Sequence, residues 1–227
     1  KMQIQGFYPD AITFLSILKA CGTMRDINKG KQIHGQIVNG GMLENNIVLG
    51  NALVDMYANC GFLAEAQNMS DALHIRNVVS WTALIGGYVK YGLDQEALDC
   101  FQQMQDDGIP PNDVTFICIV KACASIAAVE KGGEIHLEIV KRGFLPENIV
   151  LGNALIAMYV KFGVLQKAQE VFNELLNRNA VTWGLLISAY AHYGYCDSAV
   201  TYFQQMELEG SFSLDSISYV HVLKACG

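Results

Sequence analysis

An internal repeat constrains this sequence more than any other feature. Residues 47–53 recur without a change as residues 149–155, at an offset of 102 positions. When residues 47–108 are compared with residues 149–210 without a gap, 29 of 62 positions are identical. Chance does not produce such agreement, so the chain is built from repeated structural units.

Each 102-residue period contains three shorter units of 31 to 36 residues. This is the size of a helical hairpin, and such hairpins bury their apolar faces by stacking on one another. The ends of the chain cut through the pattern, so we expect a fragment of a longer array. The predicted repeats are 11–46, 47–77, 78–112, 113–148, 149–179 and 180–215, with the end of a preceding repeat at 1–10 and the start of another at 216–227.

The repeat 78–112 shows why each unit is expected to hold two helices. Gly92 can adopt the left-handed conformation that ends a helix, and Pro110 and Pro111 stop the second run. No alternating pattern of strand length competes, so we predict an all-α fold. The apolar residues at one-face helical spacing are Trp81, Leu84, Ile85 and Tyr88, followed by Ala97, Phe101 and Met104.

The composition fits a chain that is folded throughout, with 52% apolar and 16% charged residues. No apolar run reaches the roughly 18 residues that a membrane helix needs. Seven cysteines form no CxxC pair and their number is odd, so we expect small buried thiols rather than disulfides or a metal site. The formal net charge of −7 counts against strong binding to phosphates.

No enzyme motif is present, whether HExxH, GxSxG, a Walker loop or GxGxxG. His34 and His136 occupy the same place in successive periods, but they lie three hairpins apart. Convergence on one ion or one substrate is therefore implausible, and we expect a packing role. We predict that the chain has no active site and binds no cofactor.

The residues of repeat 78–112 resemble a pentatricopeptide repeat (PPR). The resemblance rests on the stretch Val79–Tyr88 (VSWTALIGGY), on Phe101–Met104 (FQQM) and on Gly108–Asn112 (GIPPN). The succession of 36, 31 and 35 residues is similar to the long, short and standard repeats of the plant PLS subclass. The resemblance covers nearly the whole chain and implies a right-handed α-solenoid of stacked hairpins.

Such repeats bind single-stranded RNA, with one base per repeat. In the family, the fifth and last residues of a repeat read the base, while the second packs against base faces. The resemblance implies the reading pairs Asn51–Asn77 (a pyrimidine), Thr82–Asn112 (adenine) and Asn153–Asn179 (a pyrimidine), with Asp215 as the last residue of 180–215. It implies base packing by Val48, Val79, Val150 and Val181, and Lys90 and Lys161 are predicted phosphate contacts.

Each of these predictions has a plainer alternative. The amides of Asn51 and Asn153 could satisfy backbone groups at a helix start, Asn77 and Asn179 could be turn residues, and the valines could pack within the hairpin. The repeat 180–215 departs from the family pattern, because Gly184 replaces a polar fifth residue.

Two functions remain open from the sequence. The first is RNA recognition in a mitochondrial or chloroplast protein that selects cytidines for C-to-U editing, with catalysis elsewhere, because the HxE…CxxC deaminase signature is absent. The second is a protein-binding solenoid that docks an editing cofactor. The net charge favours the second function, as do Leu15 and Ile117, which are fifth residues of the long repeats that cannot hydrogen-bond.

Overall fold

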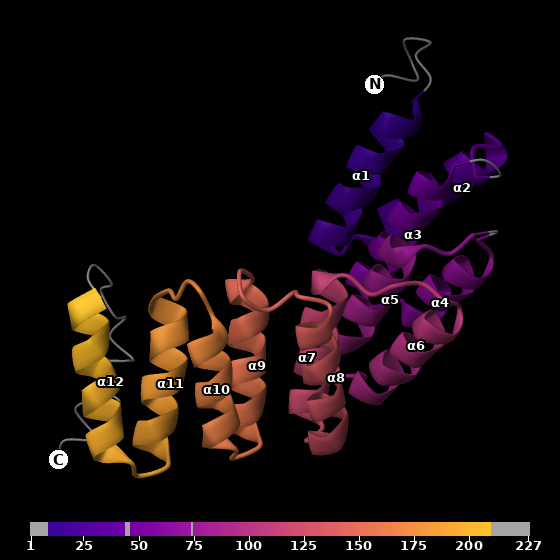
Figure 1. The fold of residues 1–227 in the computed structure, drawn as a ribbon. Helices are drawn as coiled ribbons and strands as arrows, with labels where there is room; N and C mark the ends of the chain where they lie inside the picture. The colour runs from indigo at the N-terminus through magenta and orange to yellow at the C-terminus, as the bar shows by residue number, and fades with distance from the viewer. Residues whose placement is uncertain (1–8, 44–45, 74, 210–227) are drawn as a thin grey trace. The chain divides into compact units, whose positions relative to one another are not determined.

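The computed structural model describes residues 9–43, 46–73 and 75–209. Over these residues the chain forms twelve α-helices and no strand, which confirms the all-α prediction (Figure 1). Residues 1–8, 210–215 and the predicted seventh repeat start lie outside this part. The helices are α1 (Ala11–Met24), α2 (Ile27–Asn39), α3 (Ile47–Cys60), α4 (Leu63–Asp71), α5 (Val78–Lys90), α6 (Asp94–Asp106), α7 (Asp113–Ser125), α8 (Val129–Lys141), α9 (Ile149–Lys161), α10 (Leu165–Glu174), α11 (Ala180–His192) and α12 (Cys196–Glu209).

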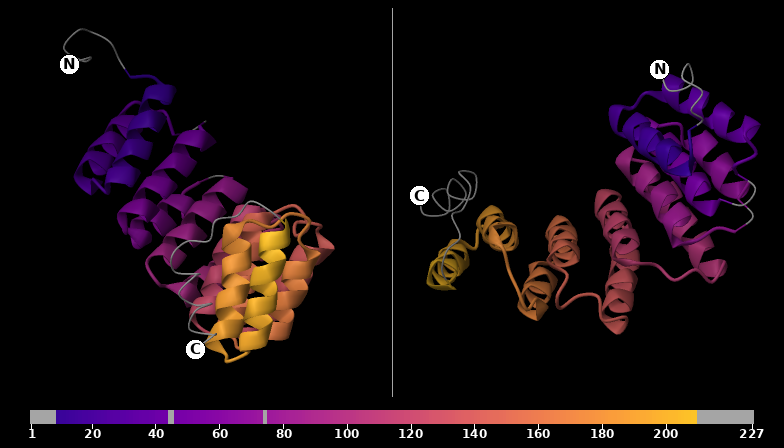
Figure 2. Two further views of the ribbon diagram at one scale, coloured as in Figure 1. Left: turned by 90° about the vertical axis from the view of Figure 1, so that its left-hand side faces the viewer. Right: turned by 90° about the horizontal axis from the view of Figure 1, so that it is seen from above.

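The chain divides into two compact units, residues 1–119 and residues 120–227, with the division inside α7. In unit 1, α3 packs against α1, α4 and α5, and α5 packs against α6. In unit 2, α9 packs against α10 and α11, and α11 packs against α12. Seen from above, the helices of unit 2 alternate between two layers, with α9 and α11 in one layer and α10 and α12 in the other (Figure 2).

The core lies between the two helices of each pair and between successive pairs. Trp81 and Trp183 are both buried, as are the two apolar stripes predicted for α5 and α6, except that Tyr88 is only half buried. The Tyr88 hydroxyl donates to Gln67 Oε1 of α4 at 3.3 Å, so the ring spans from core to surface. A lone hairpin would leave these apolar faces in water, and stacking removes them from it.

Glycine ends the first helix of the short and standard repeats, as predicted for Gly92, whose φ is +74°. The long repeats differ. At the corresponding helix ends, Arg25 and Ala127 both have a φ of +55°, a conformation that costs a non-glycine residue free energy.

An arginine near the end of each short repeat lies over an aromatic ring. Arg76 stacks on the Trp81 ring, 4.6 Å from its centroid, and forms ion pairs with Asp71 at 3.2 Å and Asp107 at 3.4 Å. In unit 2, Arg178 lies over the ring of Phe172 at 4.6 Å.

His34 and His136 make the same packing contact in their respective units. His34 Nδ1 lies 2.9 Å from the Tyr57 hydroxyl, and His136 Nδ1 lies 2.8 Å from the Tyr159 hydroxyl. Each pair joins the second helix of a long repeat to the first helix of a short repeat. Burial lowers the pKa of both histidines.

The thiols are only partly as expected. Cys21, Cys100 and Cys123 are buried, whereas Cys60, Cys118 and Cys196 are half buried, and Cys226 lies outside the described residues. Within the described ranges there is no cluster of side chains that could hold a metal ion. In that same part of the chain, no helix has both the length and the apolarity to cross a membrane.

Candidate nucleic-acid interface

In each of the six predicted repeats between residues 11 and 215, the second residue is an exposed β-branched aliphatic residue. These side chains stand in the first turn of each first helix and are between 49% and 72% exposed, so packing within the hairpin does not explain them. They form an apolar row along the first helices of each unit. The row consists of Ile12, Val48, Val79 and Val114 in unit 1 and of Val150 and Val181 in unit 2.

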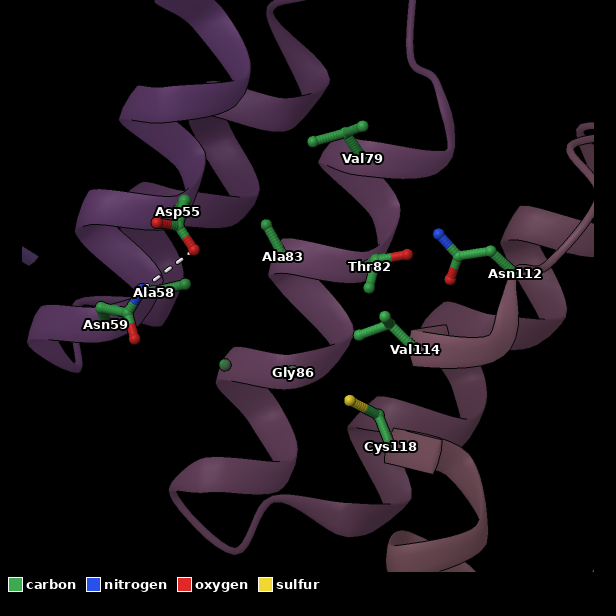
Figure 3. A pocket seen from close by; sticks show the side chains of 11 residues that line it. Asp55, Ala58, Asn59, Val79, Thr82, Ala83, Gly86, Asn112, Val114 and Cys118 are labelled. Carbon is green, nitrogen blue, oxygen red and sulfur yellow. Dashed lines mark hydrogen bonds between the residues drawn. The ribbon is translucent and has the colours of Figure 1, made fainter. Parts of the chain in front are cut away.

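A pocket of about 400 Å³ lies in unit 1, between α3, α5 and the start of α7 (Figure 3). It brings together the two residues predicted to read a base in repeat 78–112 and the valine predicted to pack against that base. It is lined by Asp55, Ala58, Asn59, Val79, Thr82, Ala83, Gly86, Gly87, Asn112, Val114 and Cys118.

Thr82 and Asn112 face one another in this pocket, Thr82 from α5 and Asn112 from the residue before α7 (Figure 3). Asn112 Oδ1 accepts hydrogen bonds from the backbone N–H and the hydroxyl of Thr115, each at 2.8 Å. The Asn112 side chain therefore caps α7, and its amide nitrogen remains for the pocket. Val79 and Val114 stand on either side of the pair (Figure 3).

The predicted pair of the short repeat 47–77 is also in contact. Asn51 Nδ2 donates to Asn77 Oδ1 at 3.2 Å. Asn77 Oδ1 also accepts from the backbone N–H groups of Val79 and Ser80, so Asn77 caps α5. Asn51 is only 7% exposed, and its own Oδ1 is buried without a hydrogen-bond partner among the described residues.

The second short repeat, 149–179, has the same arrangement. Asn153 Nδ2 donates to Asn179 Oδ1 at 3.5 Å, and Asn179 caps α11 by accepting from the backbone of Thr182 at 3.0 Å. Asn153 Oδ1 is buried and unpartnered in the described part of the chain. Asn77 and Asn179 are therefore N-caps of α5 and α11 rather than the plain turn residues of the alternative.

For Asn51 and Asn153 the helix-start alternative is wrong, because their amides bond to another side chain and not to the backbone. In the repeat 180–215, Gly184 is buried and offers no hydrogen-bonding side chain. The last residue of that repeat, Asp215, lies outside the described residues.

The predicted phosphate contacts have different surroundings. Lys90 Nζ donates to Asn59 Oδ1 at 2.8 Å and to the Asn59 carbonyl at 3.2 Å, so the protein already engages this ammonium. Lys161 is exposed and makes no ion pair or hydrogen bond with any described residue. Asp55 accepts from Asn59 Nδ2 at 2.9 Å, and desolvation by the surrounding protein raises the pKa of its carboxyl group.

Leu15 and Ile117 are half buried in the first helices of the long repeats. Each therefore offers only part of its side chain to the partner that the protein-binding alternative proposes. A second pocket, of about 420 Å³, lies in unit 2 beside Tyr190, Tyr193 and Tyr195, and none of the predicted readers lines it.

The structure adds residues that the sequence analysis did not select. Val114 holds the same second position as Val79, so the repeat register alone could have found it. Thr115 and Asp55 carried no signal in the sequence, because their significance depends on the repeat packed against them.

Comparison with known proteins agrees with the geometry. Residues 76–125 match the model of the PPR repeat family, and residues 153–179 and 181–211 match the PPR repeat. The pentatricopeptide repeat-containing protein At1g03540 of Arabidopsis thaliana is 37% identical over 223 residues, which cover 98% of this chain and 36% of that protein. The chain belongs to the pentatricopeptide repeat family.

Further PPR relatives support this assignment. The chloroplastic PPR protein At4g18520 of Arabidopsis is 38% identical over 216 residues, 95% of this chain and 34% of that protein. Another Arabidopsis PPR protein, 35% identical over 218 residues (96% of this chain and 34% of that protein), is named as mitochondrial. This chain thus spans about a third of the length of these relatives.

A solved PPR structure has the same fold. The crystal structure of the protein PPR10 in complex with an 18-nt psaJ RNA element superposes with a TM-score of 0.73. It is 18% identical, and the match covers 99% of this chain and 33% of PPR10. At this identity the likeness establishes the fold, an all-α repeat solenoid.

Proposed function

We propose that this PPR chain binds single-stranded RNA and selects its sequence with one base per repeat. One observation carries the proposal: the predicted readers Thr82 and Asn112 meet in one pocket, between the exposed side chains of Val79 and Val114. The RNA bound to PPR10, a protein of the same fold, supports it.

The pocket offers the two contacts that an unpaired base needs. A base has apolar faces that can lie against Val79 and Val114, and a polar edge that can hydrogen-bond to Thr82 and Asn112. In the short repeats, the Oδ1 atoms of Asn51 and Asn153 are unpartnered acceptors but are buried, so a base N–H satisfies them only if these side chains turn toward solvent.

We expect phosphate contacts to contribute less to RNA affinity than the base contacts do. Of the two predicted phosphate contacts, Lys161 is exposed and available to a phosphate, whereas Lys90 must leave or share its contacts with Asn59. Asp55 places a carboxyl group in the same pocket. With a net charge of −7, we expect weak binding that falls as salt is added.

We further propose the cellular role that the sequence suggested. The chain selects the target for RNA processing or C-to-U editing in an organelle, within a PLS-type array, and catalysis takes place in another domain or partner. The chloroplastic and mitochondrial relatives support an organellar location. The absence of a deaminase motif from the sequence supports a binding role.

The test is fluorescence anisotropy at about 50 and 200 mM salt, because affinity that comes from phosphate contacts falls over this range. The labelled strands are an RNA with a pyrimidine–adenine core, an RNA with those two bases exchanged, and the matching DNA. We expect the first RNA to bind most tightly and Thr82→Val to weaken it about tenfold.

Thr201→Val is the matched control, because it removes an exposed threonine hydroxyl on α12, where Thr201 bonds only to its own helix at Asp197. Equal or absent binding of all three strands would refute base recognition. That result would favour a protein partner, to which the exposed Leu137 and Val140 on α8 offer apolar contacts.

A further inference from the structure

Thr115 is a buried side chain that connects the two readers of repeat 78–112. It is the third residue of the following repeat and is fully buried in the first turn of α7. Its Oγ1 lies 2.7 Å from Thr82 Oγ1 and 2.8 Å from Asn112 Oδ1. The readers therefore belong to one hydrogen-bonded chain, Thr82–Thr115–Asn112.

The proton positions in this chain follow from what each atom can do. The Thr115 backbone N–H can only donate, so the Asn112 atom that faces it must be the carbonyl oxygen. That oxygen can only accept, so the single hydroxyl proton of Thr115 points toward it. The Thr82 hydroxyl must then donate its own proton to Thr115 Oγ1.

We infer that Thr115 fixes the hydrogen-bonding polarity of this base pocket. Thr82 Oγ1 has only lone pairs left for a base and acts as an acceptor, while Asn112 Nδ2 acts as a donor. Thr115 touches no base in this scheme and is a positioning residue. The inference rests on the proposed RNA-binding function and specifies how its best-formed pocket selects a base.

This polarity favours one chemical class of base. Adenine and cytosine present an amino donor beside an unprotonated ring nitrogen, whereas guanine and uracil present a carbonyl acceptor beside a ring N–H. At a fixed position of the ring, the Thr82 acceptor matches the amino group of adenine or cytosine, and the Asn112 donor matches the unprotonated ring nitrogen beside it. The same two atoms oppose the carbonyl and the ring N–H of guanine or uracil. We therefore expect the pocket to prefer adenine to guanine, which have rings of equal size.

The short repeats do not share this device among the described residues. The Thr182 hydroxyl donates to Asn179 Oδ1, as Thr115 does to Asn112, whereas the Ser80 hydroxyl donates to the backbone carbonyl of Asn77. Neither hydroxyl is bonded to a fifth residue. The fifth residues Asn51 and Asn153 bond directly to the last residue instead. Thr182→Val is therefore a matched control, because it removes an equally buried capping hydroxyl that touches only one reader.

The experiment measures the dissociation constants of RNAs that differ only in the base X of a pyrimidine–X core. The proteins are the wild-type chain, Thr115→Val, Thr115→Ser and Thr182→Val, and thermal unfolding checks that each is folded. Thr115→Ala is a second variant without the hydroxyl, for use if valine prevents folding.

For the wild type we expect a preference for adenine over guanine of about tenfold. This ratio should fall severalfold in Thr115→Val and Thr115→Ala, because the Thr82 hydroxyl becomes free to donate. It should stay at the wild-type value in Thr115→Ser, which keeps the hydroxyl, and in Thr182→Val.

An adenine preference that survives in both Thr115→Val and Thr115→Ala would overturn the role of Thr115 and leave base recognition intact. A wild-type chain that binds no RNA, or binds every X equally, would overturn base recognition in this pocket and the inference with it.

Discussion

Two adjacent glycines on α5 have opposite surroundings, and an alanine at each tests how closely α3 and α5 pack. A Cβ atom on Gly87 would lie 2.7 Å from Ala58 Cβ on α3 and 3.1 Å from Leu63 Cδ2. A Cβ atom on Gly86 would meet only Cys118 Sγ, at an ordinary 3.7 Å. Ala58 Cβ is fixed to its backbone, so Gly87→Ala must push the two helices apart.

The magnitude follows from comparing the two variants. Each replaces glycine with alanine inside the same helix, which by itself stabilises a helix by about 1 kcal/mol. That gain cancels in the difference, which leaves the cost of overpacking at Gly87, about 1–3 kcal/mol. We expect Gly86→Ala to be more stable than the wild type by about 1 kcal/mol, and Gly87→Ala to be less stable than Gly86→Ala by the overpacking cost.

The assay is urea unfolding monitored by circular dichroism. The midpoints of the variants are compared, provided that the dependence of the unfolding free energy on urea concentration is the same in each. Equal midpoints for the two variants would refute the close packing of α3 on α5. RNA binding gives a second measurement for Gly86→Ala, because Gly86, like Gly87, lines the base pocket and an added methyl group there narrows the pocket. We expect Gly86→Ala to bind RNA more weakly than the wild type does, although the variant is the more stable protein.

Three further predictions concern side chains of the pocket and the histidine–tyrosine contact. Asn112→Asp keeps the oxygen that caps α7 but replaces the amide donor with an acceptor. The urea midpoint of unfolding should be unchanged, and the base preference measured by fluorescence anisotropy should move from adenine toward guanine. Asp55→Asn keeps the contact with Asn59 but removes a negative charge from the pocket; RNA affinity should rise by at most about fivefold at low salt, and less at high salt. Burial lowers the pKa of His136 below its unfolded value of about 6.5, so the stability linked to it is present above about pH 6.5 and is lost as the pH falls toward the folded pKa; the urea midpoint should drop between about pH 7.5 and 5.5, and His136→Gln should reduce that drop.

Much of the fold could be predicted because each repeat carries the same apolar spacing and the same helix-ending residues. The apolar spacing around Trp81 and the glycine at position 92 are each sufficient to place a helix or its end, and the structure agrees with both. The ends of α1 and α7 could not be predicted in this way, since Arg25 and Ala127 adopt a positive φ without the glycine that usually signals it.

The candidate site was predictable in position but not in detail. The repeat register indicates which residues are fifth, last and second, and the pocket brings Thr82, Asn112 and Val79 together. The register does not show that Asn51 is buried or that Lys90 is bonded to Asn59. Each of these facts depends on a side chain from the neighbouring repeat, about 30 residues away in the chain.

The sequence by itself determined the helical repeat and the register of its candidate readers, because helix spacing, caps and period are properties of short segments. Only the tertiary structure decided that Thr115 joins Thr82 to Asn112, and that Gly87 lies against Ala58. Proton direction and helix spacing are set where two repeats pack together. There, the position of one side chain is fixed by atoms of the other repeat.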